Sequence, residues 1–151
     1  MPPDHELDAP PWLRVESTIM ATARQLRCYY DRHLAELDLN LSQASLLAYV
    51  AEFGPHTQTA LAARMDLGRA ATGTVIDQLE ARGLLTRTPD PDDRRVWRIA
   101  PTPAATDVVC RIAAIDTVVR DTLRAGINRN ERQELASVLV RLQENMAADQ
   151  P

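Results

Sequence analysis

Apolar side chains recur at spacings of three and four residues through most of the chain, which places them along one face of an α-helix. The first such run extends from Trp12 to about Leu37 and predicts one long helix. Its apolar face consists of Val15, Ile19, Ala23, Leu26, Tyr30, Leu34 and Leu37. Residues 1–11 are rich in proline and polar side chains, so we expect a flexible arm there.

A second helix is expected from about residue 42. Ser42 is a residue type that caps helix N-termini, and Leu41 before it can pack against Leu46. Gly54 and the proline after it are expected to end the helix. The inner face of this helix is predicted to be Leu46, Leu47, Val50 and Phe53.

Two further helices in close succession form the pattern of a helix–turn–helix. Thr57 is expected to cap the first of them, which turns Leu61, Ala62 and Met65 inward. After a turn at 66–68, the second runs from Arg69 to Arg82, and Gly83 suits its C-terminal end. Its buried face is predicted to be Thr72, Val75, Ile76 and Leu79.

A hairpin and two more helices complete the predicted elements. The strand-like runs Leu84–Thr88 and Arg95–Ala100 flank the loop Pro89–Arg94 and predict a two-stranded wing. Prolines at 101 and 103 start a fifth helix with an apolar face at Val108, Ile112, Ile115, Val119 and Leu123. Asn128 and Glu131 have the spacing of a capping box. The last helix is then carried by Leu135, Val138, Leu139, Leu142 and Met146.

These elements predict a mainly α (α+β) fold, a winged helix–turn–helix with a two-stranded wing. A DNA-binding domain would occupy residues 41–101, flanked by dimerisation helices at 12–40 and 102–147. The flanking helices carry more apolar surface than the central module can cover, which usually marks an oligomer interface. A two-fold homodimer is the commonest closed arrangement.

Charge is unevenly distributed along the chain, whose formal net charge is −4. Residues 57–100 hold seven arginines against six acidic residues, so basic charge is relatively concentrated in the expected DNA-binding module. No apolar run approaches the roughly 18 residues that span a membrane, and the acidic, proline-rich N-terminus is unlike a secretory signal. Two cysteines form no disulfide framework, and we therefore expect a cytoplasmic protein without membrane contact.

The outward face of the helix 69–82 and the tip of the wing are the candidate DNA contacts. Small side chains on that helix would allow a close approach to a major groove, and a nearby arginine or glutamine could contact a phosphate or a base edge. The alternative is a solvated helix face whose small residues suit helix packing. The predicted DNA-binding set is Thr57, Gln58, Arg69, Ala70, Gly73, Thr74, Gln78, Arg94 and Arg95.

The loop of the wing suggests two different roles for its charged residues. Arg94 and Arg95 could enter a minor groove, where narrow tracts concentrate negative potential. Asp93 is expected to pair with Arg95 and stiffen the turn. A calcium loop is a poor interpretation of Asp90, Asp92 and Asp93, because a proline intervenes and no glutamate follows at the twelfth position.

The chain resembles the MarR family of winged helix–turn–helix transcriptional regulators from about Val15 to Met146. The resemblance is carried by Leu61–Ala62–Ala63–Arg64–Met65, Ile76–Asp77–Gln78–Leu79–Glu80–Ala81–Arg82–Gly83–Leu84–Leu85–Thr86–Arg87 and Asp90–Pro91–Asp92–Asp93–Arg94–Arg95. It implies a homodimeric repressor that binds a pseudo-palindromic operator in double-stranded DNA. It also implies that a small phenolic or lipophilic effector releases the repressor from DNA. Glycines at 68 and 73 depart from the family pattern, because a serine or threonine cap is usual at the first and glycine weakens a helix at the second.

Several residues have both a functional and a structural interpretation. Trp12, His33 and Tyr49 could line an effector pocket or serve as packing anchors. Cys28 is flanked by arginines that could lower a thiol pKa, so a redox-sensing regulator is one alternative, and an ordinary, partly buried cysteine is the other. A protein-interaction module that does not bind DNA is a third interpretation, favoured by the acidic net charge. The sequence has no catalytic constellation and no metal-ligand spacing, so we expect neither an enzyme nor a cofactor.

Overall fold

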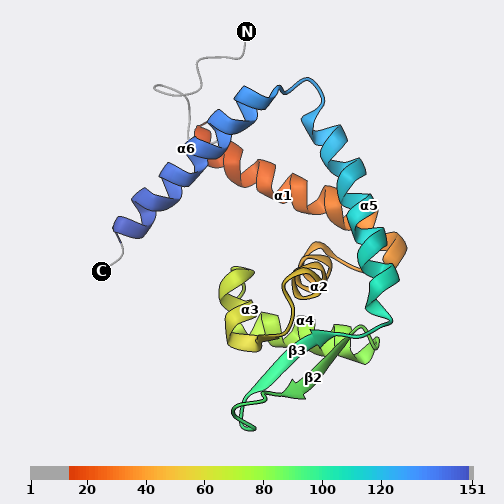
Figure 1. Cartoon of the computed structure of the whole chain (residues 1–151). Coiled ribbons are helices and arrows are strands. Elements are labelled where there is room, and N and C mark those ends of the chain that lie inside the picture. The colour runs from red at the N-terminus through yellow and green to blue at the C-terminus, as the bar shows by residue number, and fades with distance from the viewer. Residues whose placement is uncertain (1–13, 150–151) are drawn as a thin grey trace. The chain divides into compact units, whose positions relative to one another are not determined.

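The computed structural model describes residues 14–149, and the chain divides into two compact units, residues 1–117 and 118–151. The expected arm at 1–11 and the predicted helix start at Trp12 lie outside the described residues. In chain order the elements are α1 (Val15–Leu34), η2 (Ala35–Leu37), α2 (Leu41–Phe53), β1 (His56–Thr57), α3 (Gln58–Arg64), α4 (Arg69–Ala81), β2 (Leu85–Pro89), β3 (Trp97–Pro101), α5 (Ala105–Arg124) and α6 (Arg129–Ala148) (Figure 1). The mainly helical winged fold predicted from the sequence is confirmed.

The wing belongs to a three-stranded antiparallel sheet with the order β1-β3-β2. Strands β2 and β3 pair from Leu85 opposite Pro101 to Pro89 opposite Trp97. The prediction of two strands missed β1, which adds His56 and Thr57 to the free edge of β3. Figure 1 shows the β2–β3 turn projecting away from the helices α2, α3 and α4.

Helix α2 begins two residues earlier than a Ser42 cap would place it, because Asn40 and not Ser42 is its N-cap. Asn40 and Gln43 form a reciprocal capping box, in which each backbone N–H donates to the other side chain at 2.9 Å. Phe53 was also wrongly predicted to face inward. It is 59% exposed, and its ring lies beside that of Tyr49 with 4.7 Å between centroids.

The helix–turn–helix formed by α3 and α4 follows the predicted pattern. Thr57 caps α3 through a 3.2 Å bond from the backbone N–H of Ala60. The predicted inner face of α4 is buried throughout, at Thr72, Val75, Ile76 and Leu79. Gly83, whose φ is +71°, follows the end of this helix in the left-handed conformation that favours glycine.

Gly73 reflects packing between α3 and α4. A Cβ at this position would lie 2.9 Å from Nε2 of Gln58, whose side chain reaches across from α3. Glycine therefore allows the Gln58 side chain to lie against α4. Gly68 is the N-cap of α4 without a side-chain bond, and Thr72 Oγ1 donates to its carbonyl oxygen at 3.0 Å.

The core of the first unit is formed by fully buried side chains from the C-terminal end of α1, from α2, α3 and α4, and from the sheet. The largest of these include Leu34, Leu46, Leu47, Leu61, Ile76, Leu79, Leu85 and Ile99. Most of the predicted inner face of α1 lies outside this core, since Leu34 is the one buried residue of the helix as described. Val15, Met20 and Leu26 are exposed in the single chain.

Helix α6 is capped as predicted, since Asn128 and Glu131 form a capping box. Its predicted apolar face is not buried in the single chain, because α6 contains no buried residue among those described. Leu135, Val138, Val140 and Met146 are exposed. No helix within the described range 14–149 is long and apolar enough to cross a membrane.

Candidate nucleic-acid interface and effector pocket

The outward face of α4 follows directly from the burial of its other side. Arg69, Ala70, Thr74 and Gln78 are exposed, and Gly73 is half-buried. The hydroxyl of Thr74 donates to the carbonyl oxygen of Ala70 at 3.1 Å, which satisfies it within the helix. This face of the helix therefore carries short side chains and an arginine at its N-terminal end. A helix with such a face can fit into a major groove.

Three of the predicted contact residues already have partners within the protein. Gln78 accepts a hydrogen bond from the side chain of Gln43 on α2 at 2.8 Å. Thr57 and Gln58 are both half-buried, since Thr57 caps α3 and Gln58 lies against Gly73. Their side chains therefore help to position α3 and α4.

The seven arginines of residues 57–100 fall into two groups. Three bind protein groups: Arg82 donates to the carbonyl oxygens of residues 37 and 38, Arg87 pairs with Asp77 and Glu80, and Arg98 pairs with Asp90. The other four have no hydrogen bond or ion pair from their guanidinium groups within the described residues, and all are exposed. They are Arg64, Arg69, Arg94 and Arg95.

Asp77 is exposed on the outward face of α4, where its carboxylate forms an ion pair. Its carboxylate receives the Arg87 guanidinium at 2.5 Å, and the same guanidinium bonds Glu80 one turn later. Arg87 lies on β2, so this ion pair joins the helix to the wing. The two negative charges of Asp77 and Glu80 are thereby partly offset by one arginine of the wing.

The carboxylate of Asp90 organises the turn of the wing, a role that was not predicted from the sequence. One carboxylate oxygen accepts the backbone N–H groups of Asp92 and Asp93 at 2.8 and 3.2 Å, and the other accepts from Arg98. The Asp92 amide and the Arg98 guanidinium hold the pKa of the Asp90 carboxyl below its ordinary value. An aspartate that bonds the backbone two residues ahead is a common turn device, so the sequence did contain a signal for this role.

The expected pairing of Asp93 with Arg95 takes a different form in the structure. The backbone N–H of Arg95, and not its guanidinium, donates to Asp93 Oδ1 at 2.9 Å. The side chains of Arg94 and Arg95 are both exposed. Both guanidinium groups remain available at the end of the wing.

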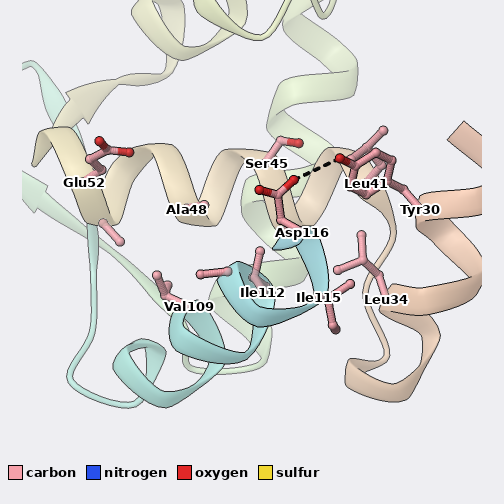
Figure 2. A pocket seen from close by; sticks show the side chains of 13 residues that line it. Tyr30, Leu34, Leu41, Ser45, Ala48, Glu52, Val109, Ile112, Ile115 and Asp116 are labelled. Carbon is pink, nitrogen blue, oxygen red and sulfur yellow. Dashed lines mark hydrogen bonds between the residues drawn. The ribbon is translucent and has the colours of Figure 1, made fainter. Parts of the chain in front are cut away.

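A cavity of about 410 Å³ lies between α1, α2 and α5 within the first unit. Figure 2 shows the hydroxyl of Tyr30 directed to Asp116, to whose Oδ1 it donates at 2.9 Å. Ser45 and Glu52 provide the other polar groups of the lining. The apolar lining consists of Leu34, Leu41, Ala44, Ala48, Ala51, Val109, Ile112, Ala113 and Ile115.

Two of the three residues proposed from the sequence for an effector pocket do not line this cavity, and the third is not described by the structure. Trp12 lies outside the described residues, and neither His33 nor Tyr49 belongs to the lining. The ring of His33 contacts that of Tyr29 at 4.8 Å, and the ring of Tyr49 lies 5.2 Å from that of His56. Both His33 and Tyr49 thus make ring contacts outside the cavity lining.

The remaining candidate chemistry is sparse. Cys28 is exposed, which corrects the expectation of a partly buried side chain, and its thiol has no hydrogen bond among the described residues. The part of the chain covered by the structure contains no group of three side chains that could bind a metal ion. The surface of α4 and the wing, together with the cavity, are therefore the candidate functional features.

Comparison with known proteins shows similarity to transcriptional regulators. Residues 39–97 match the sequence model of the MarR family. The chain is similar to the transcriptional regulator SlyA, with 25% identity, a TM-score of 0.80, and coverage of 89% of this chain and 95% of SlyA. A probable transcriptional regulator from Pseudomonas aeruginosa gives 26% identity, a TM-score of 0.72, and coverage of 85% and 99%. The chain is also similar to BpsR of Bordetella bronchiseptica, whose DNA binding is regulated by 6-hydroxynicotinic acid. The identity is 19%, the TM-score is 0.82, and the match covers 91% of this chain and 98% of BpsR.

Proposed function

We propose that this chain is a DNA-binding, ligand-responsive repressor of the MarR family. The match of residues 39–97 to the family model and the similarity to SlyA support this proposal. The observation that carries this proposal is the set of four arginines on α3, α4 and the wing that are unpaired among the described residues. The carboxylates of Asp77, Glu80 and Asp90 are paired within the protein. The four guanidinium groups outnumber the three carboxylates of residues 57–100 that have no ion pair within the described part of the chain, those of Asp66, Asp92 and Asp93. Positive charge is thus in local excess on a protein with a net charge of −4, and phosphate binding needs such a local concentration.

In this proposal α4 enters the major groove and the wing contacts the flanking backbone or minor groove. Arg69 and Arg94 would bind phosphates or base edges. The small side chains of Ala70, Gly73 and Thr74 would let the helix backbone approach the groove floor. Gln78 would contribute from the position in which Gln43 holds it. Arg95 would add a second positive charge at the tip of the wing.

A two-fold homodimer would place two such surfaces on a pseudo-palindromic operator. The exposed apolar side chains of α1 and α6 support dimerisation, since apolar faces of this kind are normally covered in an assembly. We assign DNA binding to residues 41–101 and dimerisation to 12–40 and 102–147. The two recognition helices would then read half-sites about one helical turn apart, and the protein would act in the cytoplasm.

The cavity between α1, α2 and α5 is the proposed effector site. BpsR shows that DNA binding within this fold can respond to a small aromatic molecule. Helix α2 supplies much of the cavity lining, and Gln43 of the same helix bonds Gln78 on α4. An effector that displaces α2 would thus move a residue of the DNA-contacting face.

A footprint on the DNA flanking the coding region of this protein tests the proposal. We expect a protected, pseudo-palindromic segment about two helical turns long, and binding that weakens steeply as salt increases. The double variant Arg69→Gln, Arg94→Gln lacks two of the proposed contacts. It should lose protection of the DNA while keeping the thermal stability of the wild type. Equal protection by this variant, or no protected segment on any fragment, would contradict the proposal.

A further inference from the structure

We propose that the effector cavity selects a cationic ligand, an amine attached to a compact apolar body, and that Glu52 and Asp116 determine this selectivity. The inference rests on the proposed function, because it assigns a ligand class to the proposed effector site. The proposed ligand carries the opposite charge to 6-hydroxynicotinic acid, the aromatic acid that regulates BpsR.

The polar groups of the cavity are all suited to accept hydrogen bonds from a donor. Glu52 and Asp116 provide carboxylates, and Ser45 and Tyr30 provide hydroxyl oxygens. The described lining includes no arginine, lysine or histidine. An ammonium group has donors and no acceptor, so it matches this set.

An anionic ligand would meet the opposite situation. A ligand carboxylate would lie near two protein carboxylates without a cation in the lining to offset its charge. Repulsion between like charges grows where water is displaced by apolar walls, which applies most to the half-buried Asp116 and less to the exposed Glu52. The cavity therefore disfavours aromatic acids of the kind that regulate BpsR.

The two carboxylates occupy different parts of the cavity. Asp116 accepts the hydroxyl of Tyr30 at 2.9 Å, and Figure 2 shows both beside the first turns of α2. Glu52 lies toward the other end of the same helix (Figure 2). It is exposed, and it makes no hydrogen bond or ion pair within the described part of the chain. An ammonium ligand would give Glu52 the counter-charge that the protein does not supply.

The size of the cavity limits the apolar body of the ligand. A volume of about 410 Å³ lies at the lower end of the range for small-molecule sites, which suits one or two rings. The aliphatic walls formed by α2 and α5 would cover those rings, and the carboxylates would orient the amine. A naphthylmethyl group is a suitable probe body because the same frame is available with a cationic, neutral or anionic substituent.

Calorimetric titration of the full chain at pH 7, without DNA, tests the inference with 1-naphthylmethylamine, 1-naphthalenemethanol and 1-naphthoate. We expect the amine to bind about tenfold more tightly than the alcohol, the effect of one charge-assisted hydrogen bond, and the acid to bind most weakly. Glu52→Gln and Asp116→Asn should each reduce amine affinity several-fold and leave alcohol affinity unchanged. Asp66→Asn, which removes one charge from the α3–α4 turn, should change none of the three.

The opposite results would overturn the inference. They are binding of naphthoate as tight as that of the amine, the same amine affinity in the cavity variants and in Asp66→Asn, or no binding of any of the three probes. Operator binding measured on the same preparations without ligand separates this outcome from failure of the proposed function. Retained DNA binding without amine preference would overturn the ligand class alone, and absent DNA binding would overturn the proposed function.

Discussion

The side-chain amide of Gln43 donates a hydrogen bond to the side-chain oxygen of Gln78 at 2.8 Å. Gln43 also completes the capping box of α2, and the residues that follow it, Ala44 and Ser45, line the cavity. Gln78 lies on the exposed face of α4. One side chain thus joins the wall of the proposed effector site to the proposed DNA-contacting helix.

We expect Gln43→Ala to weaken operator binding roughly fivefold, the effect of removing one hydrogen bond that holds Gln78 in position. The same change in a Gln78→Ala background should have no further effect, because coupled residues do not contribute additively. Fluorescence anisotropy with labelled operator measures all four proteins. The control is Asn40→Ala, which disrupts the same cap but keeps the hydrogen bond to Gln78. Additive effects of the two alanines would show that this hydrogen bond does not influence DNA binding.

Arg87 is expected to support DNA binding without touching DNA. Its replacement by glutamine releases the carboxylates of Asp77 and Glu80 at the surface of α4, so operator affinity should fall. The free energy of unfolding should change by less than about 1 kcal/mol, because the pairs are partly exposed. Adding Asp77→Asn to Arg87→Gln should recover much of the affinity. If the double variant binds as weakly as Arg87→Gln alone, Asp77 is not the source of the weaker binding.

The turn of the wing should depend on pH through Asp90. Because its pKa is lowered in the folded protein, its bonds stabilise the turn above the ordinary value of about 3.8. That contribution disappears as the pH falls through the lower, folded pKa. Trp97 is 54% exposed and pairs with Pro89 beside the turn, so its fluorescence in a Trp12→Phe variant reports the transition. Asp90→Asn should remove the transition, whereas Asp92→Asn should retain it.

The thiol alternative predicts that oxidation of Cys28 abolishes DNA binding. We expect peroxide to leave operator binding of the wild type and of Cys28→Ser equal, because the thiol is exposed and makes no hydrogen bond among the described residues. Cys110→Ser serves as the matched control, since that thiol is also exposed. Peroxide release of the wild type and of Cys110→Ser, with Cys28→Ser unaffected, would instead establish a redox switch.

The parts of the fold that sequence predicted well are those specified by local patterns. The buried face of α4 repeats at helical spacing, and both Thr57 and Asn128 cap helices as their positions suggested. Asn40 was missed because Ser42 is an equally good cap by residue type. The choice between them depends on which residue has the extended backbone conformation that a cap requires.

The features that sequence did not predict arise from contacts between distant segments. Strand β1 has two residues and no alternation of its own, and it is defined by pairing with Ile99 and Arg98. The cavity combines α1, α2 and α5, so Tyr30 and Asp116 meet although 86 positions separate them. Helix α6 has no buried residue among those described in the single chain. The helical spacing of its apolar residues predicts an apolar face but not whether the same chain covers it.

The salt dependence of operator binding tests most directly the central claim that the free arginines of α4 and the wing bind DNA phosphates. For the wild type we expect log affinity to fall steeply and linearly with log salt concentration. Arg69→Gln and Arg94→Gln should each reduce the slope by about one for every phosphate that is no longer neutralised, whereas Arg111→Gln, the same charge change on α5, should leave it unchanged. A wild-type affinity that does not vary with salt, or equal slopes in all four proteins, would contradict the claim.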